Sequence, residues 1–297
     1  MSFSYETKLE LCRVPVQRPC CARAEAYGIL LYCNTFQSGE VRIITENAAF
    51  ADRLPGLFRK AFRLRFDALP QPDQPGKRIF RLTDRDKLLR LRELLGCENH
   101  PVLHMNYALL EEDCCRASFL RGAFFAGGSV TDPEKRYHME LNTSHAQVGR
   151  ELEVLLRDLG YPSKNLSRNG SSITYFKQSD QIADFLTLIG APVSAMRVMT
   201  AKLEKDLRNS VNRRLNCDTA NVDKAVEASR EQMEAIRKLQ EASLLEGLSD
   251  KLQATAALRL EFPELTLSEL AEEFDPPVTK SCLNHRLRKL TELARGL

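Results

Sequence analysis

The sequence lacks any apolar run of the length that crosses a membrane, which is about 20 residues for a helix. Its first residues include Glu6 and Glu10, where a secretory signal peptide would be apolar. These absences predict a cytoplasmic protein with no membrane partner. The chain also lacks a strong excess of one charge, since 43 basic and 40 acidic residues leave a net charge of only +3. Any nucleic-acid surface must therefore come from local clusters of basic side chains.

Metal-binding and disulfide motifs are also missing, although the chain contains nine cysteines. Cys20 and Cys21 are adjacent in the sequence, as are Cys114 and Cys115, and no pair has the Cys-x-x-Cys spacing of common zinc sites. Disulfides are rare in cytosolic proteins because that compartment is reducing. We therefore expect reduced and mostly buried thiols, with neither a metal ion nor a cofactor.

Two stretches of the 297-residue chain, which is long enough for about two globular domains, are rich in small residues. Residues 119–130 have the sequence FLRGAFFAGGSV, and residues 24–34 have a similar composition. Aligning Gly28 with Gly122 places the two stretches 94 residues apart. A helix with small residues on one face lets another helix approach closely. The two stretches therefore predict a packed helix pair and two pseudo-symmetric halves.

The second stretch resembles the LAGLIDADG helix of homing endonucleases. In that family two such helices pack together, and an acidic residue near the end of each helix holds the divalent metal ions that cut DNA. The resemblance places these acidic positions at Cys33 and Gly127, and neither residue can hold magnesium. Asp132 and Glu40 lie beyond the helix ends, where we expect turn or surface roles. We therefore expect that the scaffold is kept and the nuclease activity is lost.

Residues 1–190 are expected to form an α+β domain in which both halves have the order helix, strand, helix, strand, strand, helix. In the first half we predict strands at residues 41–45, 62–66 and 77–82. The alternation along these strands implies one polar sheet face, which would either contact DNA phosphates or be simply solvated. The basic residues considered for this face are Arg42, Arg63, Arg65, Arg78 and Arg81.

Residues 191–245 are expected to form a basic helical linker. A helix over residues 194–216 carries six basic side chains against two acidic ones. Residues 216–221 include several types that favour caps and turns, and a second helix is expected over residues 221–245. The linker is therefore interpreted either as a helical hairpin between domains or as a DNA phosphate contact, to which Arg213 and Arg214 would contribute.

The sequence pattern of residues 246–297 predicts an all-α helix-turn-helix domain of three short helices. Thr266 and Glu269 have the spacing of a capping box that opens the second helix. Asp275 and two prolines then force a turn before a last helix over residues 279–294. This last helix has one apolar stripe facing the other two helices, formed by Leu283, Leu287, Leu290 and Ala294.

The polar face of the last helix is the candidate DNA-binding site. In helix-turn-helix proteins the N-terminal part of this helix enters the major groove, where Asn pairs with adenine and Arg with guanine. We expect base-edge contacts from Lys280, Ser281, Asn284, His285 and Arg288. We expect phosphate contacts from Arg286 and Lys289, together with Arg213 and Arg214. The alternative is a solvated helix on a small bundle.

Three segments together resemble the WhiA regulators of Gram-positive bacteria, which join a degenerate LAGLIDADG domain to a C-terminal helix-turn-helix. The segments are residues 119–130, residues 212–221 (NRRLNCDTAN) and residues 280–290 (KSCLNHRLRKL). The resemblance implies a sequence-specific regulator of transcription that binds double-stranded DNA on the nucleoid. It also implies a role in sporulation or in cell division and chromosome segregation.

Two other functions remain open on the sequence. The first is a metal-dependent DNA endonuclease, against which the residues at the acidic positions argue. The second is a docking scaffold, in which the C-terminal domain tethers the chain to DNA and the N-terminal domain binds another protein. The leading hypothesis is a regulator that is not an enzyme.

Overall fold

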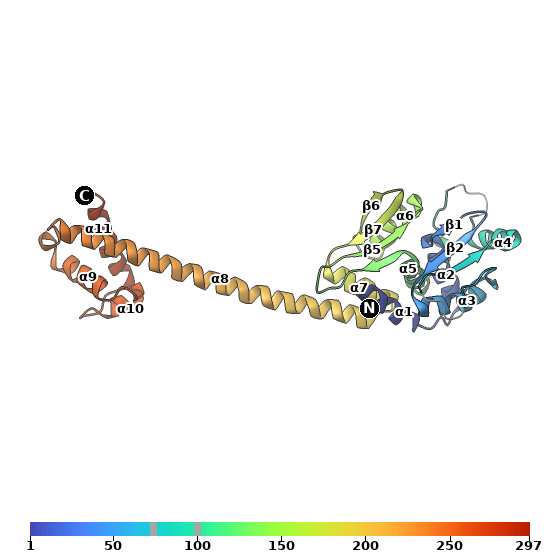
Figure 1. Ribbon diagram of the computed structural model, residues 1–297, viewed down its shortest axis with the longest axis horizontal. Helices are drawn as coiled ribbons and strands as arrows, with labels where there is room; N and C mark the ends of the chain where they lie inside the picture. Colours follow the sequence, from blue (N-terminus) through green and yellow to red (C-terminus); the bar gives the residue numbers. More distant parts are fainter. Residues whose placement is uncertain (72–75, 98–101) are drawn as a thin grey trace. The chain divides into compact units, whose positions relative to one another are not determined.

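The computed structural model describes residues 1–71, 76–97 and 102–297. The chain divides into two compact units, Met1–Lys205 and Asp206–Leu297 (units 1 and 2), each with its own hydrophobic core. Figure 1 shows the helices and strands of both units. The boundary falls within one helix, α8 (Pro192–Glu241). Across the described residues, every helix is too short or too polar to pass through a membrane.

Unit 1 is built around a closely packed pair of helices, α2 (Pro19–Tyr32) and α5 (Asp113–Gly127). A Cβ atom at Gly28 would lie 2.1 Å from the carbonyl oxygen of Phe119, and one at Gly122 would lie 2.0 Å from that of Glu25. Only glycine allows the two backbones to approach this closely, because any side chain would overlap the facing carbonyl group. The predicted close-packed helix pair is confirmed.

The first half of unit 1 adds an antiparallel sheet with the strand order β1-β2-β3. The predicted strand over residues 62–66 is wrong, because α3 continues through Phe62 and Arg63 caps it in the left-handed conformation, with φ of 56°. Leu64 and Phe66 enter the core from irregular backbone instead. The elements are α1 (Phe3–Cys12), β1 (Thr35–Phe36), β2 (Val41–Thr45), α3 (Ala48–Phe62), β3 (Arg78–Leu82) and α4 (Arg85–Leu95).

The second half repeats the arrangement, with an antiparallel sheet in the order β4-β5-β7-β6. Its first strand follows α5 directly, and a helix again separates the second strand from the next ones. The repeated arrangement confirms the predicted α+β class and the two related halves. The predicted order of helix, strand, helix, strand, strand, helix is wrong, because two strands follow the first helix of each half, and among the described residues only β3 lies between α3 and α4. The elements are β4 (Gly128–Val130), β5 (Met139–Thr143), α6 (Ala146–Asp158), β6 (Lys164–Arg168), β7 (Ser171–Phe176) and α7 (Ser179–Ile189).

The polar face of the first sheet carries two of the five arginines considered for it. Arg42 and Arg81 are direct cross-strand partners on β2 and β3. The Arg42 guanidinium donates to the Thr35 hydroxyl at 3.1 Å, and that of Arg81 lies 3.6 Å from the Glu40 carboxylate. Both cations therefore already contact neighbours in the sheet. The other three lie outside the strands or on the face of the buried residues, namely Arg63, Arg65 and Arg78.

A fully buried carboxylate joins three helices of unit 1. Glu25 of α2 accepts hydrogen bonds from Arg53 of α3, at 2.7 and 3.0 Å, and from Arg121 of α5, at 2.8 Å. Arg121 also donates to the carbonyl oxygen of Ile189, at 2.9 Å. Charge-assisted hydrogen bonds of this kind are stronger than neutral ones and are directional. The cluster therefore fixes how α3 sits against the close-packed pair.

The linker prediction needs a correction at its centre. A helical hairpin between the domains is wrong, because α8 runs without a break through residues 216–221. Asn, Asp and Thr in that stretch are poor helix formers, but their preference for turns is only a weak prior. Residues 206–228 of α8 are exposed on every side. Their side chains therefore contribute no buried surface to either core.

Unit 2 packs three short helices against the C-terminal part of α8. Their shared core includes Ala235, Ile236 and Leu239 of α8 and the apolar stripe of the last helix, which is at most 4% exposed. The predicted stripe and helix order are confirmed. The helices are α9 (Asp250–Glu261), α10 (Leu267–Glu272) and α11 (Lys280–Ala294), preceded by the short turn η2 (Leu245–Gly247).

All nine cysteines are free thiols, but the expectation that they are mostly buried is wrong. Cys33, Cys97 and Cys115 are buried. Three others are exposed and the remaining three are half-buried. The hydrophobic character of the thiol therefore does not account for most of them.

Candidate nucleic-acid interface

A capping box fixes the start of α10, the first helix of the helix-turn-helix pair. The Glu269 N–H donates to the Thr266 hydroxyl at 3.4 Å, and the Thr266 N–H donates to the Glu269 carboxylate at 2.8 Å. The hydrogen bond from the Thr266 backbone is the main cause that lowers the pKa of Glu269. The predicted capping box is confirmed, and it sets the point at which α10 begins.

A buried arginine holds the segment between α9 and α10. Arg259 is 2% exposed, and its guanidinium donates to the carbonyl oxygens of Leu265 at 2.9 Å and Phe262 at 3.4 Å. Ser229 of α8 donates to the carbonyl oxygen of Pro263 in the same segment, at 2.7 Å. Sequence reasoning missed Arg259 because an arginine on a short helix is usually solvated. Its contacts position α10 beneath the candidate recognition helix.

The turn before α11 is ordered by backbone and side-chain hydrogen bonds. The Val278 N–H donates to the carbonyl oxygen of Ala271 at 3.0 Å, which ties the end of the turn to α10. Thr279 is the N-cap of α11, and its hydroxyl accepts from the Cys282 N–H at 3.2 Å. The turn predicted at Asp275 and the two prolines is confirmed. The first turn of α11, where the positive end of the helix dipole lies, contains no acidic side chain.

The five side chains proposed for base contacts lie on the exposed part of α11. Ser281, Asn284, His285 and Arg288 have the i, i+3, i+4, i+7 spacing of a single helix face. This face lies away from the buried leucine stripe, which packs into the core of unit 2. All five residues are exposed, namely Lys280, Ser281, Asn284, His285 and Arg288. The structure therefore brings them together as one polar surface.

The cations on α11 differ in what they contact. The Arg288 Nε lies 2.9 Å from the Glu292 carboxylate, and this ion pair is largely exposed. The Arg286 guanidinium lies over the Phe274 ring, with 5.6 Å to its centroid. Lys289 is exposed and makes no ion pair within the described part of the chain. Of these three cations Lys289 is the least engaged with other side chains, because Arg288 is paired with Glu292 and Arg286 lies over Phe274.

Two further candidates for phosphate contacts lie on α8 and not on α11. Arg213 and Arg214 are exposed on α8, in the part that belongs to unit 2. Neither arginine makes a hydrogen bond or ion pair with α11 among the described residues, so the two form a basic surface on another helix. Lys280, at the start of α11, does lie near α8. It lines a cavity of about 730 Å³ together with Val222 and Ser229 of that helix.

The positions that would carry the nuclease acids lie at the C-terminal ends of the close-packed pair. Cys33 and Gly127 line one cavity of about 370 Å³, and none of the described residues around it is acidic. A Cβ at Gly127 would lie 2.2 Å from the carbonyl oxygen of Asn142, so no side chain fits there without a shift of β5. Burial raises the pKa of the Cys33 thiol to about 12, which keeps it neutral.

The two acids near these positions have local roles. A carboxylate oxygen of Asp132 accepts from the Glu134 N–H at 3.1 Å, as in an ordinary turn. Glu40 pairs with Arg81 on the sheet. Neither Asp132 nor Glu40 lines the cavity at Gly127. Among the described residues that line this cavity, no carboxylates are present to bind a magnesium ion.

Comparison with known proteins decides the family. The WhiA LAGLIDADG-like domain model matches residues 116–208, and the WhiA C-terminal HTH domain model matches residues 211–294. A protein of Ruminiclostridium cellulolyticum named "Probable cell division protein WhiA" is 36% identical over 307 residues, which cover 100% of this chain and 98% of the relative. The chain belongs to the WhiA family.

Other WhiA relatives give the same result. Proteins of the same name from Desulforudis audaxviator and Bacillus velezensis are each 38% identical, and the alignments cover 100% of this chain and 98% and 97% of theirs. The crystal structure of full-length DUF199/WhiA from Thermatoga maritima superimposes with a TM-score of 0.61 at 23% identity, covering 100% of this chain and 99% of that one. The predicted WhiA resemblance is confirmed, as is a LAGLIDADG-like α+β domain followed by a helix-turn-helix domain.

Proposed function

We propose that this WhiA-family chain is a sequence-specific regulator that binds double-stranded DNA and has no nuclease activity. The observation that carries the proposal is the exposed polar face of α11, held on a buried leucine stripe in a helix-turn-helix unit. Asn284 lies one turn from the N-terminus of that helix and Arg288 two turns. These side chains have the donors and acceptors that pair with adenine and guanine in the major groove.

Phosphate contacts complete the proposed interface. Lys289 and Arg286 lie on α11 beside the polar face, and Lys289 has an ammonium group free of ion pairs among the described residues. Arg213 and Arg214 offer further cations on α8. Such contacts supply affinity for any sequence and make binding sensitive to salt, whereas base contacts supply the discrimination.

The cellular role is proposed from the relatives. Their names describe probable cell division proteins, and we extend this role to the present chain. The chain would act on the nucleoid in the cytoplasm, regulating the transcription of genes for cell division, chromosome segregation or sporulation. A DNA-binding helix without an accompanying catalytic centre suits regulation of this kind.

The endonuclease alternative is disfavoured by the chemistry at Gly127 and Cys33. Two-metal hydrolysis of DNA needs hard oxygen ligands beside the scissile phosphate. Glycine has no ligand atom, and a thiol with a pKa of about 12 stays protonated at neutral pH. The LAGLIDADG-like unit would then serve as a scaffold, either for added DNA affinity or for a protein partner.

The test is selection of genomic DNA fragments by the full-length protein in the presence of magnesium, followed by sequencing of the bound and unbound DNA. Wild type is compared with Arg288→Ala and with the matched control Arg230→Ala. The control loses the same charge in the same unit, and its guanidinium is already paired with Glu227 at 2.7 Å.

We expect wild type and Arg230→Ala to enrich one shared motif and to leave the DNA uncut. Arg288→Ala should still bind fragments but lose the preference at one or two positions of the motif. An unchanged motif with Arg288→Ala would refute base contacts by this residue. DNA cleaved at defined positions would refute the proposal that the nuclease activity is lost.

A further inference from the structure

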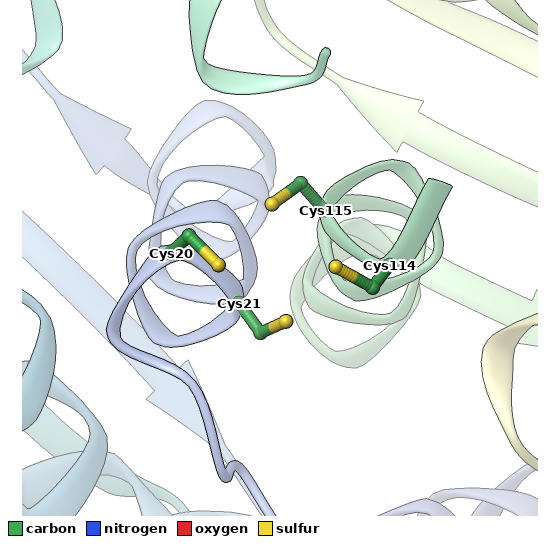
Figure 2. Close-up of side chains that lie close together, drawn as sticks. All are labelled: Cys20, Cys21, Cys114 and Cys115. Atoms are coloured by element: carbon green, nitrogen blue, oxygen red, sulfur yellow. The ribbon is translucent and has the colours of Figure 1, made fainter. Parts of the chain in front are cut away.

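Four cysteine side chains meet at the N-terminal ends of the close-packed helix pair. Cys20 and Cys21 lie in the first turn of α2, and Cys114 and Cys115 lie in the first turn of α5. Their sulfur atoms all lie within 4.8 Å of one another. Figure 2 shows the four thiols pointing into the space between the two helix ends. No other group of this kind, with at least three possible metal ligands, occurs among the described residues.

The pseudo-symmetry of unit 1 explains why two distant pairs come together. Cys20 and Cys114 lie 94 residues apart, as do Cys21 and Cys115, and this is the offset between Gly28 and Gly122. Each pair therefore occupies the equivalent turn of its helix. The glycine contacts hold the two helices close, so the distance between the sulfur atoms is set by backbone packing.

The spacing of the sulfur atoms suits a single tetrahedral metal ion. Zinc binds thiolates at about 2.3 Å, which places neighbouring sulfur atoms about 3.8 Å apart in a regular tetrahedron. The observed limit of 4.8 Å is within reach of this value by small rotations about χ1. A cluster of several iron atoms would hold its thiolates farther apart, because metal and sulfide atoms lie between them. The geometry favours one ion over a cluster.

Disulfides explain the arrangement less well. A disulfide needs two sulfur atoms about 2.0 Å apart, and all four cysteines are free thiols in this structure. Here all four sulfur atoms share one small volume. Packing of apolar thiols also fails as an explanation, because Cys20 is exposed and Cys21 and Cys114 are only half-buried.

The surroundings of the four thiols suit a negatively charged complex. Four thiolates and one Zn²⁺ carry a net charge of −2, and the positive ends of both helix dipoles point at this place. Among the described residues, no side chain caps either helix, so N–H groups of both first turns are available to the sulfur atoms. The Arg18 guanidinium lies 3.9 Å from the Cys114 sulfur and adds a full positive charge.

We propose that Cys20, Cys21, Cys114 and Cys115 bind one zinc ion as a structural site that clamps α2 to α5. The four thiols release their protons to water as the ion binds. Four protein ligands fill the tetrahedron and leave no open position, so the ion would stabilise the fold and would not act as a catalyst. The site lies at the opposite end of the helix pair from Cys33 and Gly127, so it is distinct from the former nuclease centre.

The first experiment measures the metal content of the full-length protein, purified with a reducing agent and dialysed against EDTA. The test variant is Cys20→Ser, because this side chain is exposed and its loss leaves the core intact. The matched controls are Cys217→Ser and Cys282→Ser, two exposed cysteines outside the cluster. We expect one zinc ion per chain in wild type and in both controls, and loss of the zinc in Cys20→Ser.

A second measurement uses wild type alone and does not depend on the folding of a variant. Replacement of zinc by Co²⁺ should give the intense visible bands of a tetrahedral tetrathiolate site, together with sulfur-to-cobalt charge transfer in the near ultraviolet. Wild-type protein without zinc, full zinc retention by Cys20→Ser or an octahedral cobalt spectrum would each overturn the proposal. Iron in place of zinc, or two disulfides among these four cysteines that persist in protein purified with the reducing agent, would overturn it as well.

Discussion

Gly122→Ala is a direct test of the helix pair on which unit 1 is built. The new Cβ would lie 2.0 Å from the carbonyl oxygen of Glu25, whereas ordinary contact begins at 3.4 Å. The two helices must therefore separate locally by about 1.4 Å, or bend. Overpacking of this kind costs about 1–3 kcal/mol, and the upper value applies because the facing atoms belong to the backbone. Alanine has a higher helix propensity than glycine, which stabilises the helix by about 0.8–1.0 kcal/mol. The net decrease in the free energy of unfolding is therefore about 2 kcal/mol.

The measurement is differential scanning calorimetry of the full-length protein. The two units have separate cores, so we expect two transitions, and that of unit 2 serves as an internal reference. For a unit of this size about 2 kcal/mol corresponds to a decrease of roughly 4–8 °C in the unit 1 transition.

Gly56→Ala in α3 is the matched control, because nothing lies within 4 Å of its Cβ position. This variant should raise the unit 1 transition slightly through helix propensity. A Gly122→Ala protein that melts at or above the wild-type temperature would refute the close contact.

Four further predictions concern single side chains. Glu25→Gln leaves the buried Arg121 and the half-buried Arg53 without their carboxylate and should destabilise unit 1 by about 3–5 kcal/mol, measured by the same calorimetry. A loss below about 1 kcal/mol would contradict the role of the buried carboxylate. Asn284→Ala should weaken binding to the enriched motif by about 1–3 kcal/mol and leave random DNA nearly unaffected in fluorescence anisotropy, whereas equal losses on both would argue against base contact. Lys289→Ala should weaken binding to every sequence and reduce the slope of log K against log salt by about one unit, and an unchanged slope would remove it from the phosphate ligands. The capping hydrogen bonds lower the pKa of Glu269, so its stabilisation is present above the carboxyl pKa of the unfolded chain and is lost as the pH falls through the lowered value. Glu269→Ala should therefore lower the unit 2 transition at neutral pH but not in strong acid, and a pH-independent difference would contradict the capping role.

The parts of the fold that could be predicted from the sequence depend on local sequence patterns. The helix pair follows from small residues on one face, and the capping box and leucine stripe depend on positions within a few turns of one another. The existence of two related halves was recognisable because the same pattern of small residues occurs twice. The polar face of α11 follows from the same reasoning, because a helix that buries one stripe must expose the other.

The features that sequence reasoning predicted wrongly or missed have different physical causes. The strand predicted over residues 62–66 has suitable residue types, but the hydrophobic ones pack into the core from irregular backbone. The break predicted in α8 relied on turn-favouring residues, and the helix continues through them. Glu25 gave no signal because its partners Arg53 and Arg121 lie 28 and 96 residues away.

The cysteine cluster illustrates the same limit in a sharper form. Rules for metal motifs consider ligands a few residues apart, and adjacent cysteines do not satisfy them. The informative signal was the equal offset of the two pairs, which matches the offset of the glycines. Comparing polar positions between the two halves, as well as the small ones, would have drawn attention to the four thiols.

The exposed stretch of α8 has a consequence for how the chain responds to proteases. Residues 206–228 have no buried side chain, so water competes for their helical hydrogen bonds without opposition from tertiary packing. An isolated helix of this length is marginal in water, and the several asparagines in this stretch weaken it further. Transient fraying would admit a protease at this point while each unit keeps its own core. A single cut would then release the helix-turn-helix unit from the LAGLIDADG-like unit with both still folded.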